Sequence, residues 1–180
     1  MRILNLNPAV RIADIRLKHA PAMFRWMCDP VVAGNIGLRQ KPSLRKTQEW
    51  IQRASRDATV CPNAISLDGK HVGNLVLDRI DRYLATARLS IYIGEKDALG
   101  AGVATTAMYL VLKKMFAAEK LHKVWLTVHE HNTPAIVTYT RFGFIVEGIL
   151  RDEFRLGNRR VNALLMSMLR SEFQQIRFVQ

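Results

Sequence analysis

The chain has 180 residues, 49% of them hydrophobic and 23% charged, which is typical of one globular domain and excludes a disordered or fibrous chain. Its net charge of +12 favours anionic partners such as nucleic acid, an acidic membrane or a phosphorylated small molecule. The two cysteines, Cys28 and Cys61, lack metal-ligand spacing, and no uncharged stretch is long enough to span a membrane. We therefore expect a single cytoplasmic domain over residues 1–180, with reduced thiols and no metal.

The first third of the chain predicts a strand followed by two helices. Asp29-Pro30 should end the first helix, because the residue before a proline is pushed out of the helical region. Ser43 is a good N-cap for the second helix. The expected elements are a strand at Val10–Arg16, a helix at Lys18–Met27, an irregular connection at Val31–Pro42 and a helix from Ser43 to about Arg56.

The remainder of the chain alternates between strand and helix periodicity. Asp68-Gly69 is a strong two-residue hairpin signal between two apolar runs. The expected elements are strands at Val60–Leu67, His71–Ile80 and Ala85–Ile93, a helix at Gly102–Ala118, a strand at Val124–Val128, a helix at Thr133–Arg141, and strands at Phe144–Leu150 and Asn162–Arg170. The order β-α-α-β-β-β-α-β-α-β-β indicates a mixed α/β domain, one strand-helix-strand unit within an otherwise antiparallel sheet.

A glycine-rich turn precedes the most regular of the predicted helices. It reads Leu99-Gly100-Ala101-Gly102-Val103-Ala104-Thr105, and no Gly-Lys-Ser/Thr follows as it would in a P-loop. Backbone N–H groups at a helix N-terminus have no intrahelical partners, and together with the helix dipole they can bind a pyrophosphate. Gly100 and Gly102 would let the phosphates approach the backbone. A packing turn with small residues is the alternative interpretation of the same pattern.

Two segments resemble the GNAT superfamily of acetyl-CoA-dependent N-acetyltransferases. The turn resembles that family's acetyl-CoA loop, Arg/Gln-x-x-Gly-x-Gly/Ala followed by Thr, except that Leu99 replaces Arg or Gln. The segment His129–Gly148 resembles the family pattern N-x-x-A-I-x-x-Y-x-x-x-G-F-x-x-E-G. The resemblance implies a mostly antiparallel seven-stranded sheet flanked by about four helices, and acetyl-CoA as co-substrate. The cofactor-binding residues it implies are Ile91, Tyr92, Ile93, Leu99, Gly100, Ala101, Gly102, Val103, Ala104, Thr105, Asn132 and Tyr139.

The same resemblance assigns chemical roles. Tyr139 would act as general acid toward the departing CoA thiolate, and Asn132 would bind the pantetheine arm, cap the following helix, or do both. Arg88 stands near the position where relatives often carry an acidic base, so Glu130 becomes the first candidate for the base, followed by His129 and His131. Water could equally remove the proton. The thioester oxygen would meet a backbone N–H of residues 91–93, splayed by a bulge.

The sequence narrows the class of amine that would accept the acetyl group but does not identify the compound. Glu-Gly-Ile-Leu-Arg-Asp-Glu-Phe, ending at Phe154, resembles the branch of ribosomal-protein N-terminal and aminosugar-nucleotide acetyltransferases, although Asn162 stands where these relatives usually have Asp. We expect a small-molecule or peptide amine, and a UDP-linked amino sugar is the most specific candidate. A protein N-terminus and a catalytically silent CoA- or nucleic-acid-binding module are the alternatives. The basic residues are not gathered with aromatics on one helix, which argues against nucleic acid. A homodimer is compatible with the sequence.

Overall fold

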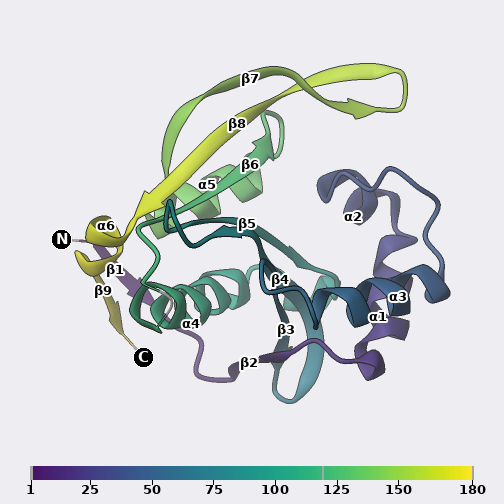
Figure 1. Ribbon diagram of the computed structural model, residues 1–180, viewed down its shortest axis with the longest axis horizontal. Coiled ribbons are helices and arrows are strands. Elements are labelled where there is room, and N and C mark those ends of the chain that lie inside the picture. The colour runs from purple at the N-terminus through teal and green to yellow at the C-terminus, as the bar shows by residue number, and fades with distance from the viewer. Residues whose placement is uncertain (1, 119, 180) are drawn as a thin grey trace.

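A computed structural model describes residues 2–118 and 120–179 of the chain (Figure 1). The strands are β1 Arg2–Asn5, β2 Val10–Asp14, β3 Cys61–Leu67, β4 Lys70–Asp81, β5 Thr86–Ile93, β6 Lys123–His129, β7 Ile145–Leu156, β8 Arg159–Leu169 and β9 Ile176–Val179. The helices are α1 Ala20–Met27, α2 Pro30–Asn35, α3 Leu44–Ala54, α4 Val103–Ala118, α5 Thr133–Phe142 and α6 Arg170–Gln174. Two 3-10 turns, Leu17–His19 and Lys96–Ala98, precede α1 and α4.

Seven strands form the central sheet in the order β2-β3-β4-β5-β6-β8-β7. All neighbouring pairs are antiparallel except β5 and β6, which run parallel across the connection through α4. The turn between β3 and β4 contains Asp68 and Gly69 at φ 49° and 78°, as a two-residue hairpin requires. The predicted mixed, mostly antiparallel seven-stranded sheet is confirmed.

The two faces of the sheet are covered by different helices. On one face, Leu75 and Leu77 of β4 and Leu89 of β5 pack with buried residues of α4 and α5 in the main core. On the other face a smaller cluster joins Trp26 of α1 and Ile51 of α3 to the sheet. Figure 1 shows α1, α2 and α3 gathered at one end of the molecule, apart from α4 and α5.

The segment after α1 differs from its prediction. It was expected to be irregular, but residues 30–35 form helix α2. Pro30 occupies the first helical turn, where a missing N–H costs nothing, and the Asp29 side chain accepts a hydrogen bond from Val31 N at 2.8 Å. Asp-Pro therefore ends one helix and also begins the next. Ser43 caps α3 as predicted, accepting from Lys46 N at 3.2 Å.

The C-terminal half contains more strand than the sequence predicted. Strand β7 extends to Leu156, six residues beyond its predicted end, and β8 begins at Arg159, three residues before its predicted start. The tip of this hairpin reaches α2 and the residues after it: a Cβ on Gly34 would lie 4.0 Å from Leu156, and one on Gly37 would lie 3.4 Å from the ring of Phe154. The pair β1 and β9, which is parallel, was not predicted, nor was α6. Figure 1 shows β1, β9 and α6 together at the opposite end of the sheet from α2.

Candidate functional site

The loop before α4 has the geometry of an anion cradle. Gly100 and Gly102 have φ of +78° and +73°, a region that favours glycine. A Cβ on Gly100 would meet no atom within 4 Å, and one on Gly102 would only touch the Asn7 Cβ at 4.0 Å. The first helical hydrogen bond runs from Thr106 N to Gly102 O at 3.0 Å, so the N–H groups of Val103, Ala104 and Thr105 remain directed out of the helix start.

Asn7, in the connection between β1 and β2, holds this loop in place. Its backbone N donates to Thr106 Oγ1 at 2.9 Å, and its Nδ2 donates to Ala101 O at 2.9 Å. Its own Oδ1 accepts from Ala9 N at 3.0 Å. The cradle is therefore fixed by contacts within the protein. Sequence reasoning missed Asn7 because it lies 99 residues before Thr106.

Strands β5 and β6 separate next to the cradle. They pair only from Thr86 with Lys123 to Arg88 with Trp125, although β5 continues to Ile93 and β6 to His129. The predicted bulge at residues 91–93 is wrong, because β5 pairs with β4 without interruption from Arg88 to Ile93. The register shift between these strands lies between Asp78 and Asp81. The gap thus arises from the divergence of β6.

The end of β5 presents backbone groups to this gap. Gly94 N donates to Val72 O on β4 at 2.8 Å. Since hydrogen-bonding direction alternates along an antiparallel strand, the N–H and C=O groups of Ile91 and Ile93 face the side of β6. The backbone groups of Tyr92 face β4 instead. The hydroxyl of its side chain accepts a hydrogen bond from Asn74 Nδ2 at 2.6 Å. Burial raises the pKa of Tyr92 to about 12.

Tyr139 lies on α5, at the edge of the main core, with 9% of its surface exposed. Its ring is 5.8 Å from that of Phe144 in an edge-on contact. Burial raises its pKa to about 12, and its hydroxyl makes no hydrogen bond to any residue that the structure describes. The phenol therefore keeps its proton at neutral pH and has that proton available for donation. Its catalytic role stays a prediction.

Asn132 and Glu130 lie in the turn between β6 and α5. Asn132 Oδ1 accepts from Ala135 N at 3.3 Å, which confirms the capping role, and its Nδ2 donates to Asn35 Oδ1 at 3.3 Å. Glu130 is exposed, and its Oε2 accepts from Asn162 Nδ2 at 3.0 Å. Both remain candidates, Asn132 for the cofactor and Glu130 for the base.

His129 differs from Glu130 in being almost fully buried, with 3% of its surface exposed. Its Nε2 has no hydrogen-bond partner among the described residues, and its ring lies 4.4 Å from that of Phe154. Burial, with a smaller contribution from His131, holds the pKa of His129 below its usual 6.5. A neutral imidazole with an open nitrogen can accept a proton.

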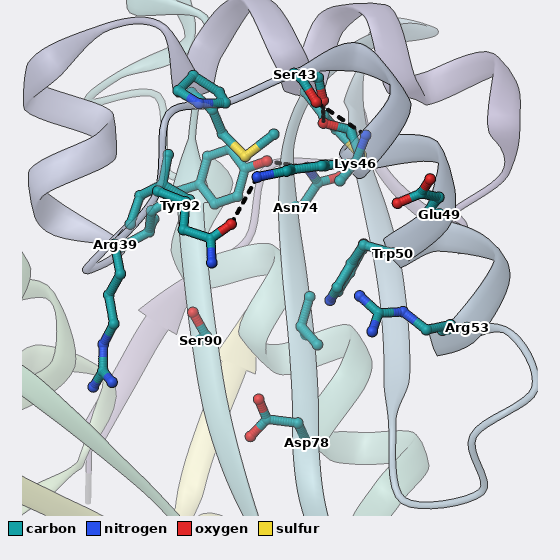
Figure 2. A pocket seen from close by; sticks show the side chains of 18 of the residues that line it. Arg39, Ser43, Lys46, Glu49, Trp50, Arg53, Asn74, Asp78, Ser90 and Tyr92 are labelled. Carbon is teal, nitrogen blue, oxygen red and sulfur yellow. Dashed lines mark hydrogen bonds between the residues drawn. The ribbon is translucent and has the colours of Figure 1, made fainter.

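A cavity of about 630 Å³ lies on the α1–α3 face of β4 and β5 (Figure 2). Alternate residues of each strand point into it, including Asn74 and Asp78 from β4 and Ser90 and Tyr92 from β5. Ser90 and Tyr92 alternate with Ile91 and Ile93, so the cavity and the gap toward β6 share one strand. The end of β5 therefore borders both the cavity and the gap.

Arg88 and Asp78 form an ion pair on the floor of the cavity. Arg88 Nε and Nη2 donate to the two oxygens of Asp78 at 2.7 Å and 2.6 Å. The hydrogen bonds to the Asp78 carboxylate raise the pKa of Arg88 above its usual value. Sequence reasoning identified Arg88 as the residue in place of an acidic base, but missed Asp78. The sequence signal that could have identified Asp78 is a charged residue within a predicted strand, and the structure places it directly opposite Arg88 in the β4–β5 pairing.

Within the described ranges, no group of three or more His, Cys, Asp or Glu side chains has an arrangement that could hold a metal ion. In the same ranges no helix combines the length and apolar character needed to cross a membrane.

Comparison of the sequence with known proteins gives a family and named relatives. The family model described as "Acetyltransferase (GNAT) domain" matches residues 10–145. Spermidine N(1)-acetyltransferase of Escherichia coli (strain K12) is 31% identical over 109 residues. That match covers 61% of this chain and 58% of the relative, so it spans less than two thirds of the relative's length.

Solved structures share the fold at lower identity. Spermidine N-acetyltransferase from Vibrio cholerae, in complex with CoA and spermine, superposes with a TM-score of 0.88 at 20% identity, covering 94% of this chain and all of that one. Mycobacterium smegmatis RimJ in complex with CoA-disulfide gives a TM-score of 0.81 at 24% identity, covering 92% of this chain and 84% of that one.

Proposed function

The chain belongs to the acetyltransferase (GNAT) domain family, and on this premise we propose that it transfers the acetyl group of acetyl-CoA to a primary amine. The observation that carries the proposal is the cradle of Gly100 and Gly102 at the start of α4, beside the gap between β5 and β6. A phosphate on a flexible arm that contains amides fits these two features. The cradle binds the phosphate, and the gap offers backbone hydrogen-bonding groups to the amides of the arm.

Acetyl-CoA would bind in an extended form along these features. Its pyrophosphate accepts hydrogen bonds from N–H groups of residues 100–105, and its pantetheine arm lies in the gap, bonded to Ile91 and Ile93 as a strand would be. Asn132 contributes through Nδ2, because its Oδ1 already caps α5. Leu99, which is 60% exposed, lines the cradle without adding a charge.

The acyl transfer then runs between the two sides of β5. A neutral amine in the cavity attacks the thioester carbon, forming a C–N bond and a tetrahedral intermediate. A backbone N–H at the end of β5 stabilises its oxyanion. Collapse breaks the C–S bond, and Tyr139 gives its proton to the thiolate. Tyr139 suits this role because its buried hydroxyl has no competing partner among the described residues.

Two groups compete for removal of the amine proton. Glu130 is exposed and held by Asn162, whereas His129 is buried, neutral and has an open Nε2. The variants Glu130→Gln and His129→Gln separate them. The loss of the base removes the acid limb from the pH profile of kcat/KM. A variant that retains this limb excludes its residue, and retention in both leaves proton removal to His131 or to water.

The acceptor class is addressed by two lines of support. The Escherichia coli and Vibrio cholerae relatives are spermidine acetyltransferases, which supports a polyamine. The motif ending at Phe154 resembles aminosugar-nucleotide enzymes, which supports a UDP-linked amino sugar. Both are small primary amines, and both would reach the thioester from the cavity beside Ser90.

Thiol release from acetyl-CoA, measured against a panel of amines, tests the reaction. We expect amine-dependent release, and CoA binding by calorimetry that weakens at least tenfold in Gly102→Val. The valine would be strained at φ +73° and its side chain would crowd the cradle. Binding of CoA without thiol release on any amine, protein N-termini included, would indicate a silent binding module. Unchanged CoA affinity in the variant would place the cofactor elsewhere.

A further inference from the structure

The cavity beside β4 and β5 has a strongly basic lining. Its cationic side chains outnumber its carboxylates by five to two. The cations are Arg39, Lys41, Lys46, Arg53 and Arg88, and the carboxylates are Glu49 and Asp78. A small cavity with this excess attracts anions and repels cations.

Both carboxylates are already occupied by arginines. Asp78 accepts two hydrogen bonds from Arg88 on the floor. Glu49 accepts from Arg45 Nη1 at 3.0 Å, and Arg45 is outside the cavity lining. The charge of Asp78 is therefore balanced by Arg88 and that of Glu49 is shared with Arg45, so the ammonium groups of a polyamine meet little uncompensated negative charge in this lining.

The remaining cations of the lining lack an acidic partner within residues 2–118 and 120–179. Arg39, Lys41 and Arg53 make no ion pair with any residue that the structure describes, and Lys46 Nζ donates only to the neutral Gln40 Oε1 at 2.8 Å. Figure 2 shows Arg39 on one side of the cavity and Lys46 and Arg53 on the other, with Ser90 between them in this view. The excess positive charge thus surrounds the space above the end of β5.

Resting on the proposed function, we propose that the acceptor is a small primary amine carrying a phosphate or diphosphate, held by Arg39, Lys46 and Arg53. Arginine and lysine donors match phosphate oxygens, and a phosphate brings up to two negative charges to balance these cations. Trp50, half-buried on α3 between Lys46 and Arg53, adds a flat apolar surface to the same wall. A polyamine such as spermidine brings only positive charge to this lining, so the acceptor differs from that of the named relatives.

Matched acceptors test the charge preference. Glucosamine, glucosamine 6-phosphate, UDP-glucosamine, spermidine and an acidic peptide with a free N-terminus are compared by thiol release. The phosphorylated amines are expected to show kcat/KM at least tenfold above glucosamine and above spermidine, with a preference that falls as salt is added. In Lys46→Gln and Arg53→Gln, KM for the phosphorylated amines should rise about tenfold, so that their advantage over glucosamine is lost. Lys114→Gln is the control, because it also removes one positive charge but lies on α4, at the other face of the sheet.

A binding measurement separates this inference from the reaction itself. With CoA saturating the cradle, UDP should bind the wild-type protein and lose at least tenfold in affinity in Arg53→Gln but not in Lys114→Gln. Acetylation of spermidine or of the acidic peptide in preference to the phosphorylated amines would overturn the inference and leave the acyl transfer intact. UDP binding with this pattern, but no acetylation of any amine, would support the anion site and overturn the proposed function. Absence of UDP binding would overturn the anion site.

Discussion

The substitution Tyr139→Phe is the most direct test of the chemistry. It removes one oxygen and keeps a ring that is 9% exposed and packed against Phe144. The hydroxyl has no hydrogen-bond partner among the residues that the structure describes, so no buried group is left unsatisfied. We therefore expect the free energy of unfolding to change by less than about 1 kcal/mol.

The effect on turnover should be much larger. A general acid contributes roughly 10²- to 10⁴-fold in rate, which corresponds to about 3–5 kcal/mol of barrier. Burial raises the pKa of Tyr139 to about 12, so the phenol is protonated throughout the range from pH 6 to 9. The loss in kcat should therefore be of similar size at every pH in that range.

Steady-state thiol release and CoA calorimetry together provide the measurement. The expected result is kcat reduced at least ~10²-fold with the Kd for CoA within about twofold of wild type. Tyr109→Phe is the matched control, because Tyr109 is a half-buried tyrosine of α4 whose ring packs 4.2 Å from that of Phe178, away from the proposed chemistry. A Tyr139→Phe rate within threefold of wild type, or a parallel loss of CoA affinity, would refute the role of proton donor.

Three further substitutions probe the cradle and its support. Leu99→Arg places a cation at a 60% exposed position beside the cradle, and calorimetry at low salt should show CoA binding about 3–10-fold tighter. Gly94→Ala would put a Cβ 2.1 Å from Cδ2 of the buried Trp26, and urea unfolding should show a loss of about 2–3 kcal/mol. Glu95→Gln tests a carboxylate whose pKa is lowered to about 2 by its hydrogen bonds from Trp26 and Lys70 and its ion pair with Arg25. A carboxylate with a lowered pKa stabilises the fold above pH 4.5, and this stabilisation is lost as the pH falls toward 2. The free energy of unfolding of the variant should therefore be about 2 kcal/mol lower at pH 7, and it should fall less steeply between pH 4.5 and pH 2 than that of the wild type.

The parts of the fold that the sequence predicted are those with local causes. The Asp68-Gly69 turn needs positive φ at two adjacent residues, and the Ser43 cap needs one side-chain oxygen near the start of a helix. The cradle is also local, because two glycines and a helix N-terminus lie within one short segment. Each of these features is determined by residues only a few positions apart.

The missed features depend on contacts between distant segments. Strands β1 and β9 are four residues each and pair with one another across nearly the whole length of the chain, which no local pattern encodes. The Asp78–Arg88 ion pair depends on the register in which β4 pairs with β5. The hydrogen bond from Asn7 N to Thr106 Oγ1 joins the connection between β1 and β2 to α4. Helix α2 is the exception, since its cap was readable and Asp29-Pro30 was interpreted only as a stop.

The division between the two sides of β5 explains how a shared fold can serve different acceptors. The cofactor side is built from backbone N–H groups whose positions follow from φ and strand register, so it persists wherever the fold persists. The acceptor side is built from side chains, and Lys46 and Arg53 come from α3, in the segment between β2 and β3. Charge on α3 can therefore change without moving any cradle amide. Membership of the family fixes the acetyl donor through the backbone, whereas the acceptor has to be inferred from the side chains of this chain alone.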